Sequence, residues 1–133
     1  MRIRPVLVLA LLVALATPSA ADAAFRQFAM PSGNIVCGGD TRFLRCDIGQ
    51  HTWRAPKKPR SCEFDWGSSI GMSRRGRVKF RCVSDSEFNT RVLKYGRTLH
   101  IGPFTCRSRR TGLRCTNAAG HGFRLSREKL VRF

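Results

Sequence analysis

The sequence predicts a mostly-β fold, a small antiparallel sandwich or barrel of short strands held together by disulfides. Three observations lead to this prediction. Apolar runs are brief and separated by frequent turn-forming residues, 6 cysteines lie within 133 residues, and no long helical period follows the first apolar stretch. Short strands with frequent turns are typical of small all-β domains.

Residues 1–23 have the three-part pattern of a secretory signal peptide. Two arginines precede an unbroken apolar run, 6–16, and Ala21-Asp22-Ala23 supplies small residues in the A-x-A spacing. That run is too short to span a bilayer, which needs about 20 apolar residues. We therefore expect cleavage after Ala23. Residues 24–133 would then form one disulfide-bridged β domain, secreted or held in the cell envelope.

Export changes the interpretation of the cysteines. An even number in a short secreted chain indicates a disulfide framework, and without a C-x-x-C pair we expect no metal and no other cofactor. Two cysteine pairs share the same spacer length, and each second cysteine follows Leu-Arg. An even spacer lets two cysteines face each other across a hairpin. This favours the bridges Cys37–Cys46 and Cys106–Cys115, and leaves Cys62–Cys82. We interpret the likeness of these two short hairpins as convergence, with duplication as the alternative.

The predicted strands are the brief runs between turns, at residues 35–37, 43–48, 77–83, 97–101, 104–106 and 123–125. The run 77–83 alternates strictly. Its side chains at 78, 80 and 82 would face the core, and its basic ones, Arg77, Lys79 and Arg81, would face solvent. Residues 126–130 fit either one helical turn with Ser126 as its N-cap or the start of a final strand.

A series of short motifs is distributed along the chain. They are PSGN at 31–34 before Cys37, LRCDI at 44–48, YGR at 95–97 before FTC at 104–106, GLRCTN at 112–117 and GHGFRLSRE at 120–128. Together they resemble a family of small secreted domains, mostly from actinobacteria, whose function is uncharacterised. The resemblance covers nearly all of the mature chain. It implies an exported, cysteine-bridged module and brings no catalytic or binding residue with it.

Charge is the strongest functional signal. The chain has 25 Lys and Arg against 8 Asp and Glu, a net charge of +17. Most of the basic residues are arginines, which bind phosphate, sulfate and carboxylate groups through two hydrogen bonds. We therefore predict a non-enzymatic binding module for anionic surfaces or polymers: a cell-envelope polymer, lipid head groups or extracellular nucleic acid. A merely solubilising surface is the alternative.

Two clusters are candidate polyanion-binding sites. The predicted site is the cluster Arg74, Arg75, Arg77, Lys79 and Arg81, because part of it lies on one face of the predicted strand. A second cluster comprises Arg107, Arg109, Arg110 and Arg114. Sequence-specific DNA binding is not expected, since no recognition helix or zinc module is visible.

Two other classes of function stay open. A bridged hairpin can present a rigid loop to a protein, as an inhibitor does, because preorganisation lowers the entropic cost of binding. A small hydrolase would use His121, which lies between two glycines and five residues before Ser126, and His51 and His100 permit a ribonuclease. The opposing interpretation of 117–122 is a turn in which Asn117 or His121 bonds the backbone.

Two tryptophans, Trp53 and Trp66, flank a segment rich in basic residues and proline. Interleaved aromatic and basic groups can stack on bases or sugars. The alternative is that both rings fill the core of a small β domain. Pro56 and Pro59 predict that the segment between the rings is a stiff connection rather than a strand.

Overall fold

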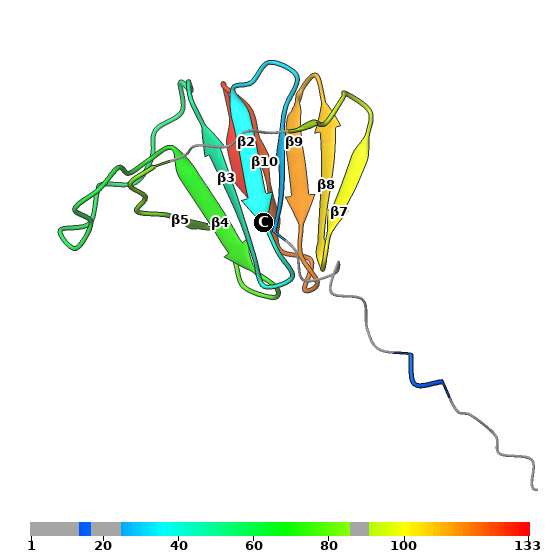
Figure 1. Cartoon of the computed structure of the whole chain (residues 1–133). Helices are drawn as coiled ribbons and strands as arrows, with labels where there is room; N and C mark the ends of the chain where they lie inside the picture. The colour runs from blue at the N-terminus through cyan, green and yellow to red at the C-terminus, as the bar shows by residue number, and fades with distance from the viewer. Residues whose placement is uncertain (1–13, 17–24, 86–90) are drawn as a thin grey trace, which may run out of the picture.

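The computed structural model describes residues 14–16, 25–85 and 91–133 of the chain. Within these ranges the chain forms eleven strands and no helix. The strands make two sheets that enclose one core (Figure 1). No helix in the described ranges is long and apolar enough to cross a membrane. The predicted signal peptide falls almost wholly on residues 1–13 and 17–24, outside the described residues.

The first sheet has the strand order β5-β4-β3-β2-β1-β6. Its strands are β1 Arg26–Ala29, β2 Ile35–Gly39, β3 Phe43–Ile48, β4 Ser69–Ser73, β5 Lys79–Phe80 and β6 Arg91–Val92. The second sheet has the order β11-β10-β9-β8-β7. Its strands are β7 Thr98–Ile101, β8 Phe104–Arg109, β9 Gly112–Thr116, β10 Gly122–Leu125 and β11 Leu130–Arg132.

The predicted mostly-β, disulfide-held fold is confirmed, and its two sheets over one core make it a sandwich. Neighbouring strands pair antiparallel except β1 and β6, which pair in parallel at Phe28 with Arg91 and Ala29 with Val92. The runs 35–37, 43–48, 104–106 and 123–125 all fall on strands, and so does 97–101 apart from Arg97. At the C-terminal end the strand alternative is correct, because no helix forms at 126–129 and β11 begins at Leu130. The Ser126 hydroxyl still accepts the Lys129 N–H, in the turn that leads into β11.

The two sheets contain the same five-strand arrangement. Strands β1–β5, here called the first meander, follow one another as neighbours, and so do β7–β11, the second meander. Each carries a disulfide between its second and third strands. In the register of the pairing, Cys37 lies opposite Cys46 and Cys106 lies opposite Cys115. The likeness that the sequence limits to two hairpins therefore extends over five strands.

All three predicted disulfides are present. Cys37–Cys46 and Cys106–Cys115 each join directly opposite residues, with Cα atoms 4.1 Å apart, and all four of these cysteines are fully buried. Cys62–Cys82 has a Cα separation of 5.7 Å and ties the β3–β4 connection to the segment after β5. The hairpin disulfides thus belong to the core, whereas the third disulfide fixes a loop.

The core is formed by the inward side chains of both meanders. Its largest fully buried members are Phe28, Phe104 and Phe123. Leu44 and Leu113, the leucines of the two Leu-Arg-Cys motifs, are also buried, at 0% and 1% exposure. Because strand side chains alternate between faces, the arginine that follows each leucine must point out of the sandwich.

The predicted strand 77–83 is wrong in extent. Only Lys79–Phe80 is a strand, and Cys82, expected on the buried face, is exposed. Pairing with β4 ends where the Arg81 N–H reaches the Ser69 carbonyl, at the first residue of β4. Beyond that point the chain pairs with the β3–β4 connection instead, through Asp65 and Val83, and this brings Cys82 to Cys62 outside the core.

Candidate anion-binding site

The outer face of the second meander carries three arginines in adjacent strands. Arg107 on β8 lies opposite Arg114 on β9, and Arg114 lies opposite Arg124 on β10. We call these three residues the arginine row. Neighbouring strands are about 4.7–4.9 Å apart, so the three side chains leave the sheet next to one another. The buried Cys106–Cys115 disulfide lies one residue away on β8 and β9 and fixes the register.

The arginine row is an unfavourable arrangement for an isolated sheet. Like charges directly opposite one another on paired strands destabilise the pairing. All three arginines are exposed, and within the described residues none forms an ion pair, since the one salt bridge found there joins Arg45 to Asp47. Arg114 does stack over the Phe133 ring, 4.9 Å from its centroid. The row thus has aromatic support but no counter-ion among these residues.

A groove of about 630 Å³ runs over this face. Besides the arginine row it is lined by Arg109 and by the hydroxyl-bearing side chains Thr98, Thr105 and Thr111. Guanidinium and hydroxyl groups are hydrogen-bond donors, so the groove offers many donors to an anion. At its side, His100 Nδ1 lies 3.2 Å from the Thr105 hydroxyl oxygen.

The first meander has the same central arginine in a different environment. Arg45 lies between Gly38 on β2 and Gly71 on β4, where the second meander has arginines. Its Nε and Nη2 donate to the two carboxylate oxygens of Asp47 at 2.9 and 2.7 Å. Its Nη2 also donates to the Asp85 carbonyl at 2.9 Å. The Arg45 and Asp47 side chains are only 23% and 9% exposed, so this pair is an internal structural contact.

The sequence-predicted cluster lies elsewhere, around the β4–β5 hairpin. All five of its side chains are exposed: Arg74, Arg75, Arg77, Lys79 and Arg81. Arg81 stacks over Phe43, 4.9 Å from the ring centroid. The hairpin turn is held by Asn117, whose amide Nδ2 donates to the carbonyls of Ser73 and Gly76 at 3.0 and 2.7 Å. A role for these five residues in binding stays a prediction.

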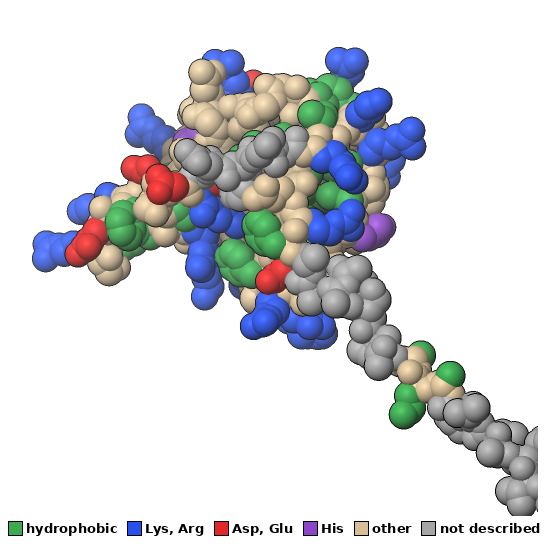
Figure 2. All heavy atoms as spheres, viewed as in Figure 1, with side chains coloured by type: hydrophobic (Ala, Val, Ile, Leu, Met, Phe, Trp, Pro, Cys, Tyr) green, Lys and Arg blue, Asp and Glu red, His purple; other side chains and the backbone are tan. Residues whose placement is uncertain are grey.

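The second sequence cluster is only partly united by the fold. Arg107, Arg109 and Arg114 line the groove, but Arg110 instead stacks over Tyr95 at 5.2 Å. Arg124, which completes the arginine row, was missed because its place depends on the pairing of β9 with β10. Lys and Arg side chains are spread over the whole visible face in Figure 2, so charge density alone does not single out a region.

A second cleft, larger than this groove, has a mixed character. It has a volume of about 1390 Å³ and is lined by acidic as well as basic side chains, among them Asp65, Asp85, Glu128, Arg109 and Arg127. Asp47 also lines it, so four of the chain's 8 acidic residues border this one cleft. Carboxylates in such number oppose the binding of an anion, and we therefore locate the candidate site in the smaller groove.

The imidazoles of His51 and His100 make contacts with neutral groups. His51 Nδ1 lies 2.9 Å from the Trp53 carbonyl oxygen, and its ring stacks on Trp53 with centroids 3.7 Å apart. For 117–122, the turn interpretation is confirmed, because the Asn117 carboxamide oxygen accepts the Ala119 and His121 N–H groups at 3.1 Å each. Within the described residues no imidazole is hydrogen-bonded to a carboxylate, the orienting contact of a catalytic triad.

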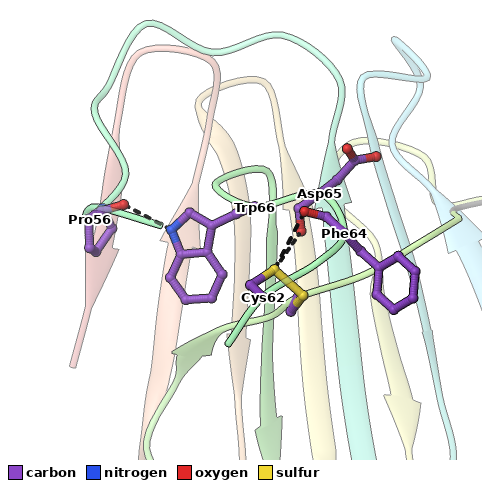
Figure 3. The surroundings of a disulfide bond; sticks show 6 residues. Pro56, Cys62, Phe64, Asp65 and Trp66 are labelled. Carbon is purple, nitrogen blue, oxygen red and sulfur yellow. Dashed lines mark hydrogen bonds between the residues drawn. A yellow bond between two sulfur atoms is a disulfide. The ribbon is translucent and has the colours of Figure 1, made fainter. Parts of the chain in front are cut away.

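The two tryptophans support the β3–β4 connection. Trp53 packs against the core and donates from Nε1 to the Ser126 carbonyl at 3.0 Å, so the core-filling interpretation is confirmed for this ring. Trp66 Nε1 donates to the Pro56 carbonyl at 2.8 Å (Figure 3). The connection extends away from the sheets at the left of Figure 1, and its Cys62 is tied to Cys82. The β3–β4 connection is therefore a basic loop that is held by Trp53 against the core and by the Cys62–Cys82 disulfide to the segment after β5.

A family model for a family of unknown function, DUF6636, matches residues 7–133. The chain belongs to this family. No curated protein and no solved structure matches the chain. Membership in DUF6636 agrees with the resemblance to an uncharacterised domain family and assigns no role to any residue, so the function has to be argued from the site itself.

Proposed function

We propose that this DUF6636 domain is a non-enzymatic binding module for anionic polymers, and that the arginine row is its main contact surface. As a protein expected to be secreted, it would meet such polymers outside the cytoplasm. Three disulfides are consistent with an oxidising, extracellular compartment. We propose no cofactor and no catalytic residue.

The observation that carries the proposal is the contrast between Arg45 and Arg114. Both follow the leucine of a Leu-Arg-Cys motif, and both point out of their sheets next to a buried disulfide. Arg45 has Asp47 as an internal counter-ion, whereas Arg114 is flanked by two further arginines. An external anion bound at the row would relieve the repulsion among the three guanidinium groups.

The geometry favours a polymer with closely spaced charges. Adjacent members of the row are about one strand spacing apart, and Arg107 and Arg109 are two residues apart on one strand, about 6.6–7 Å. A chain of phosphodiesters offers charges at comparable intervals, and each phosphate accepts two hydrogen bonds from one guanidinium group. We therefore take phosphodiester polymers, from nucleic acid or from the cell envelope, as the ligand class.

The test is the salt dependence of binding to a single-stranded DNA oligonucleotide. The variant Arg107→Gln/Arg114→Gln/Arg124→Gln removes three phosphate contacts. Each contact contributes about 0.7 to the slope of log K against log salt for single strands, so the slope should flatten by about 2. Fluorescence anisotropy over a series of salt concentrations measures both slopes.

The matched control removes the same charge from the β4–β5 hairpin, with Arg74→Gln/Arg75→Gln/Arg77→Gln. We expect this control to lose clearly less affinity than the arginine-row variant. Equal losses would mean that diffuse charge, rather than a site, attracts the polymer. A larger loss of affinity in the control would show that the polymer binds at the cluster predicted from the sequence.

A second candidate function is a protein-directed module, such as an inhibitor that presents a rigid loop. It is favoured by the β3–β4 connection, which is fixed by Cys62–Cys82 and by the Trp66–Pro56 hydrogen bond. Its exposed tip carries Lys57, Lys58 and Arg60. Binding by a preorganised loop should persist at high salt, whereas binding to a polyanion should collapse, and this difference separates the two functions.

A further inference from the structure

The two meanders can be compared residue by residue on their outer faces. Asp47 follows Cys46 on β3, and the residue that follows Cys115 on β9 is Thr116. The carboxylate that satisfies Arg45 in the first meander therefore has a threonine at its equivalent place in the second. Arg and Asp two residues apart on one strand lie on the same face, and so do Arg114 and Thr116.

We propose that the place beside Arg114 and Thr116 is a discrete subsite for one phosphate group of the polymer. This inference rests on the proposed function and makes it more specific. The bound phosphate takes the position that the Asp47 side chain occupies next to Arg45, and its two non-bridging oxygens accept from the Arg114 guanidinium group. The Thr116 hydroxyl donates to a further oxygen.

The neighbours of Thr116 suit this role. On one side it is opposite Thr105, which contributes a second hydroxyl, and on the other it is opposite Gly122, against which the Phe133 ring lies. Phe133 forms main-chain hydrogen bonds with Gly122 at 2.8 and 2.9 Å, and Arg114 stacks over its ring. A guanidinium group held by its face keeps its in-plane N–H groups available for an anion.

The donors around the subsite favour a phosphate over a carboxylate. A carboxylate has two oxygens, and a bidentate arginine uses both of them, as Arg45 does with Asp47. A phosphodiester has four oxygens and can also accept from the hydroxyls of Thr116 and Thr105. The first meander has no hydroxyl at the place of Thr105, since β2 carries Val36 there, opposite Asp47.

The test supplies the missing carboxylate. Thr116→Asp should reproduce the Arg45–Asp47 arrangement inside the second meander and occupy the subsite from within. We expect it to weaken binding of a single-stranded DNA oligonucleotide by at least about 10-fold at 50 mM salt. Thr116→Asn has a similar shape to Thr116→Asp and no charge. It exchanges the hydroxyl donor for an amide donor, so we expect a loss of about 2- to 3-fold, clearly smaller than the loss in Thr116→Asp.

The charge-matched control is Thr111→Asp, in the exposed β8–β9 turn at the rim of the groove. It alters the net charge by the same amount, and we expect a loss of about 2- to 3-fold. Equal losses from Thr116→Asp and Thr111→Asp would overturn the subsite. A loss in Thr116→Asn as large as that in Thr116→Asp would also overturn it, because the added carboxylate would then not be what blocks the subsite.

The combined results distinguish a failure of the proposed function from a failure of the subsite alone. If the unchanged protein does not bind the oligonucleotide, or the arginine-row variant binds equally well, the proposed function fails. If the row is required but Thr116→Asp behaves like its control, only the subsite fails. Polyglutamate of equal charge tests the ligand class, and binding it more tightly than the oligonucleotide would overturn the phosphate assignment. Thermal unfolding of each variant verifies that it is folded.

Discussion

The two meanders share the arrangement of their buried residues but differ in the residues on their outer faces. Each has a Leu-Arg-Cys motif, a fully buried disulfide between opposite cysteines and a Cα separation of 4.1 Å at that disulfide. On the first meander the motif arginine lies between two glycines and is paired with Asp47. On the second it lies between two arginines that are exposed. The shared core therefore fixes where an arginine points, and its neighbours decide whether it stabilises the fold or is available to a ligand.

Gly71 illustrates how the first meander closes its outer face. A Cβ atom at this position would collide with the Phe43 ring, which lies over it. Phe43 is in turn covered by Arg81, so the face near Arg45 is layered. The equivalent of Gly71 in the second meander is Arg124, and the equivalent of Phe43 is Gly112. On that face a ring lies elsewhere, since Phe133 lies against Gly122 on β10 and is covered by Arg114.

The largest expected effect tests the shared part of the comparison. The double variants Cys37→Ala/Cys46→Ala and Cys106→Ala/Cys115→Ala each remove one hairpin disulfide. For loops of this length we expect each to lower the free energy of unfolding by about 3 kcal/mol, and by similar amounts, since the two loops have the same length. Urea denaturation measures both. A difference above about 2 kcal/mol would show that the two hairpins are not equivalent.

The next effect tests the difference between the two faces. Asp47→Asn removes the counter-ion of a largely buried arginine, and we expect a loss of about 2 kcal/mol in the free energy of unfolding. Thr116→Asn changes the equivalent position of the second meander and should stay within about 0.5 kcal/mol. Denaturation of both variants under one condition gives the contrast. Equal losses would contradict the assignment of Asp47 as an internal partner.

A smaller effect concerns the arginine row. Arg114→Gln removes the central charge of three in a row, and we expect a gain of about 0.5 kcal/mol in the free energy of unfolding at low salt. The gain should shrink at high salt, where repulsion is screened. Arg45→Gln should instead destabilise. A loss of stability in Arg114→Gln at low salt would show that Arg114 has a structural role.

The sequence predicts the shared part of the two meanders well. Cysteine spacing identifies all three disulfides, because a hairpin restricts which cysteines can be opposite each other. The sequence does not predict that Cys82 lies outside the core. The alternation at 77–83 is regular, but β4 starts at Ser69 and offers no partner beyond Arg81. The alternation of apolar and polar residues in one strand does not show where the neighbouring strand ends, and therefore does not show how far the pairing extends.

The candidate site is less predictable than the fold. Arg107, Arg109 and Arg114 are close in sequence and form a visible cluster, but Arg124 joins them only through the pairing of β9 with β10. Conversely, Arg45 belongs to the same motif as Arg114, but it is paired with Asp47, two residues later, and is therefore not available to a ligand. That spacing is visible in the sequence, and comparing the two Leu-Arg-Cys motifs would have indicated which arginine is internally paired.

The smallest expected effect lies in the two hairpin turns. In the first turn the Asp40 carboxylate accepts the N–H groups of Arg42 and Phe43 at 2.7 and 3.1 Å. These hydrogen bonds, that from Arg42 foremost, lower the pKa of Asp40 below its ordinary value, while Arg42's charge contributes a smaller lowering. A carboxylate whose pKa is lowered in the folded state stabilises the fold at pH values above its unfolded pKa, about 3.9. This stabilisation is lost as the pH falls through the pKa of the folded state.

The second turn has Arg109 at the position of Asp40 and therefore lacks this acid-sensitive contact. An NMR titration should show the Arg42 and Phe43 amide resonances moving together with a midpoint below about 3.9. The Thr111 and Gly112 amides should not follow that midpoint. Asp40→Asn should abolish the shared movement while the β2–β3 pairing persists, because Cys37–Cys46 still joins the strands. A midpoint at or above the ordinary value would mean that the turn does not hold the carboxylate, and the first hairpin would then differ from the second only in its outer face.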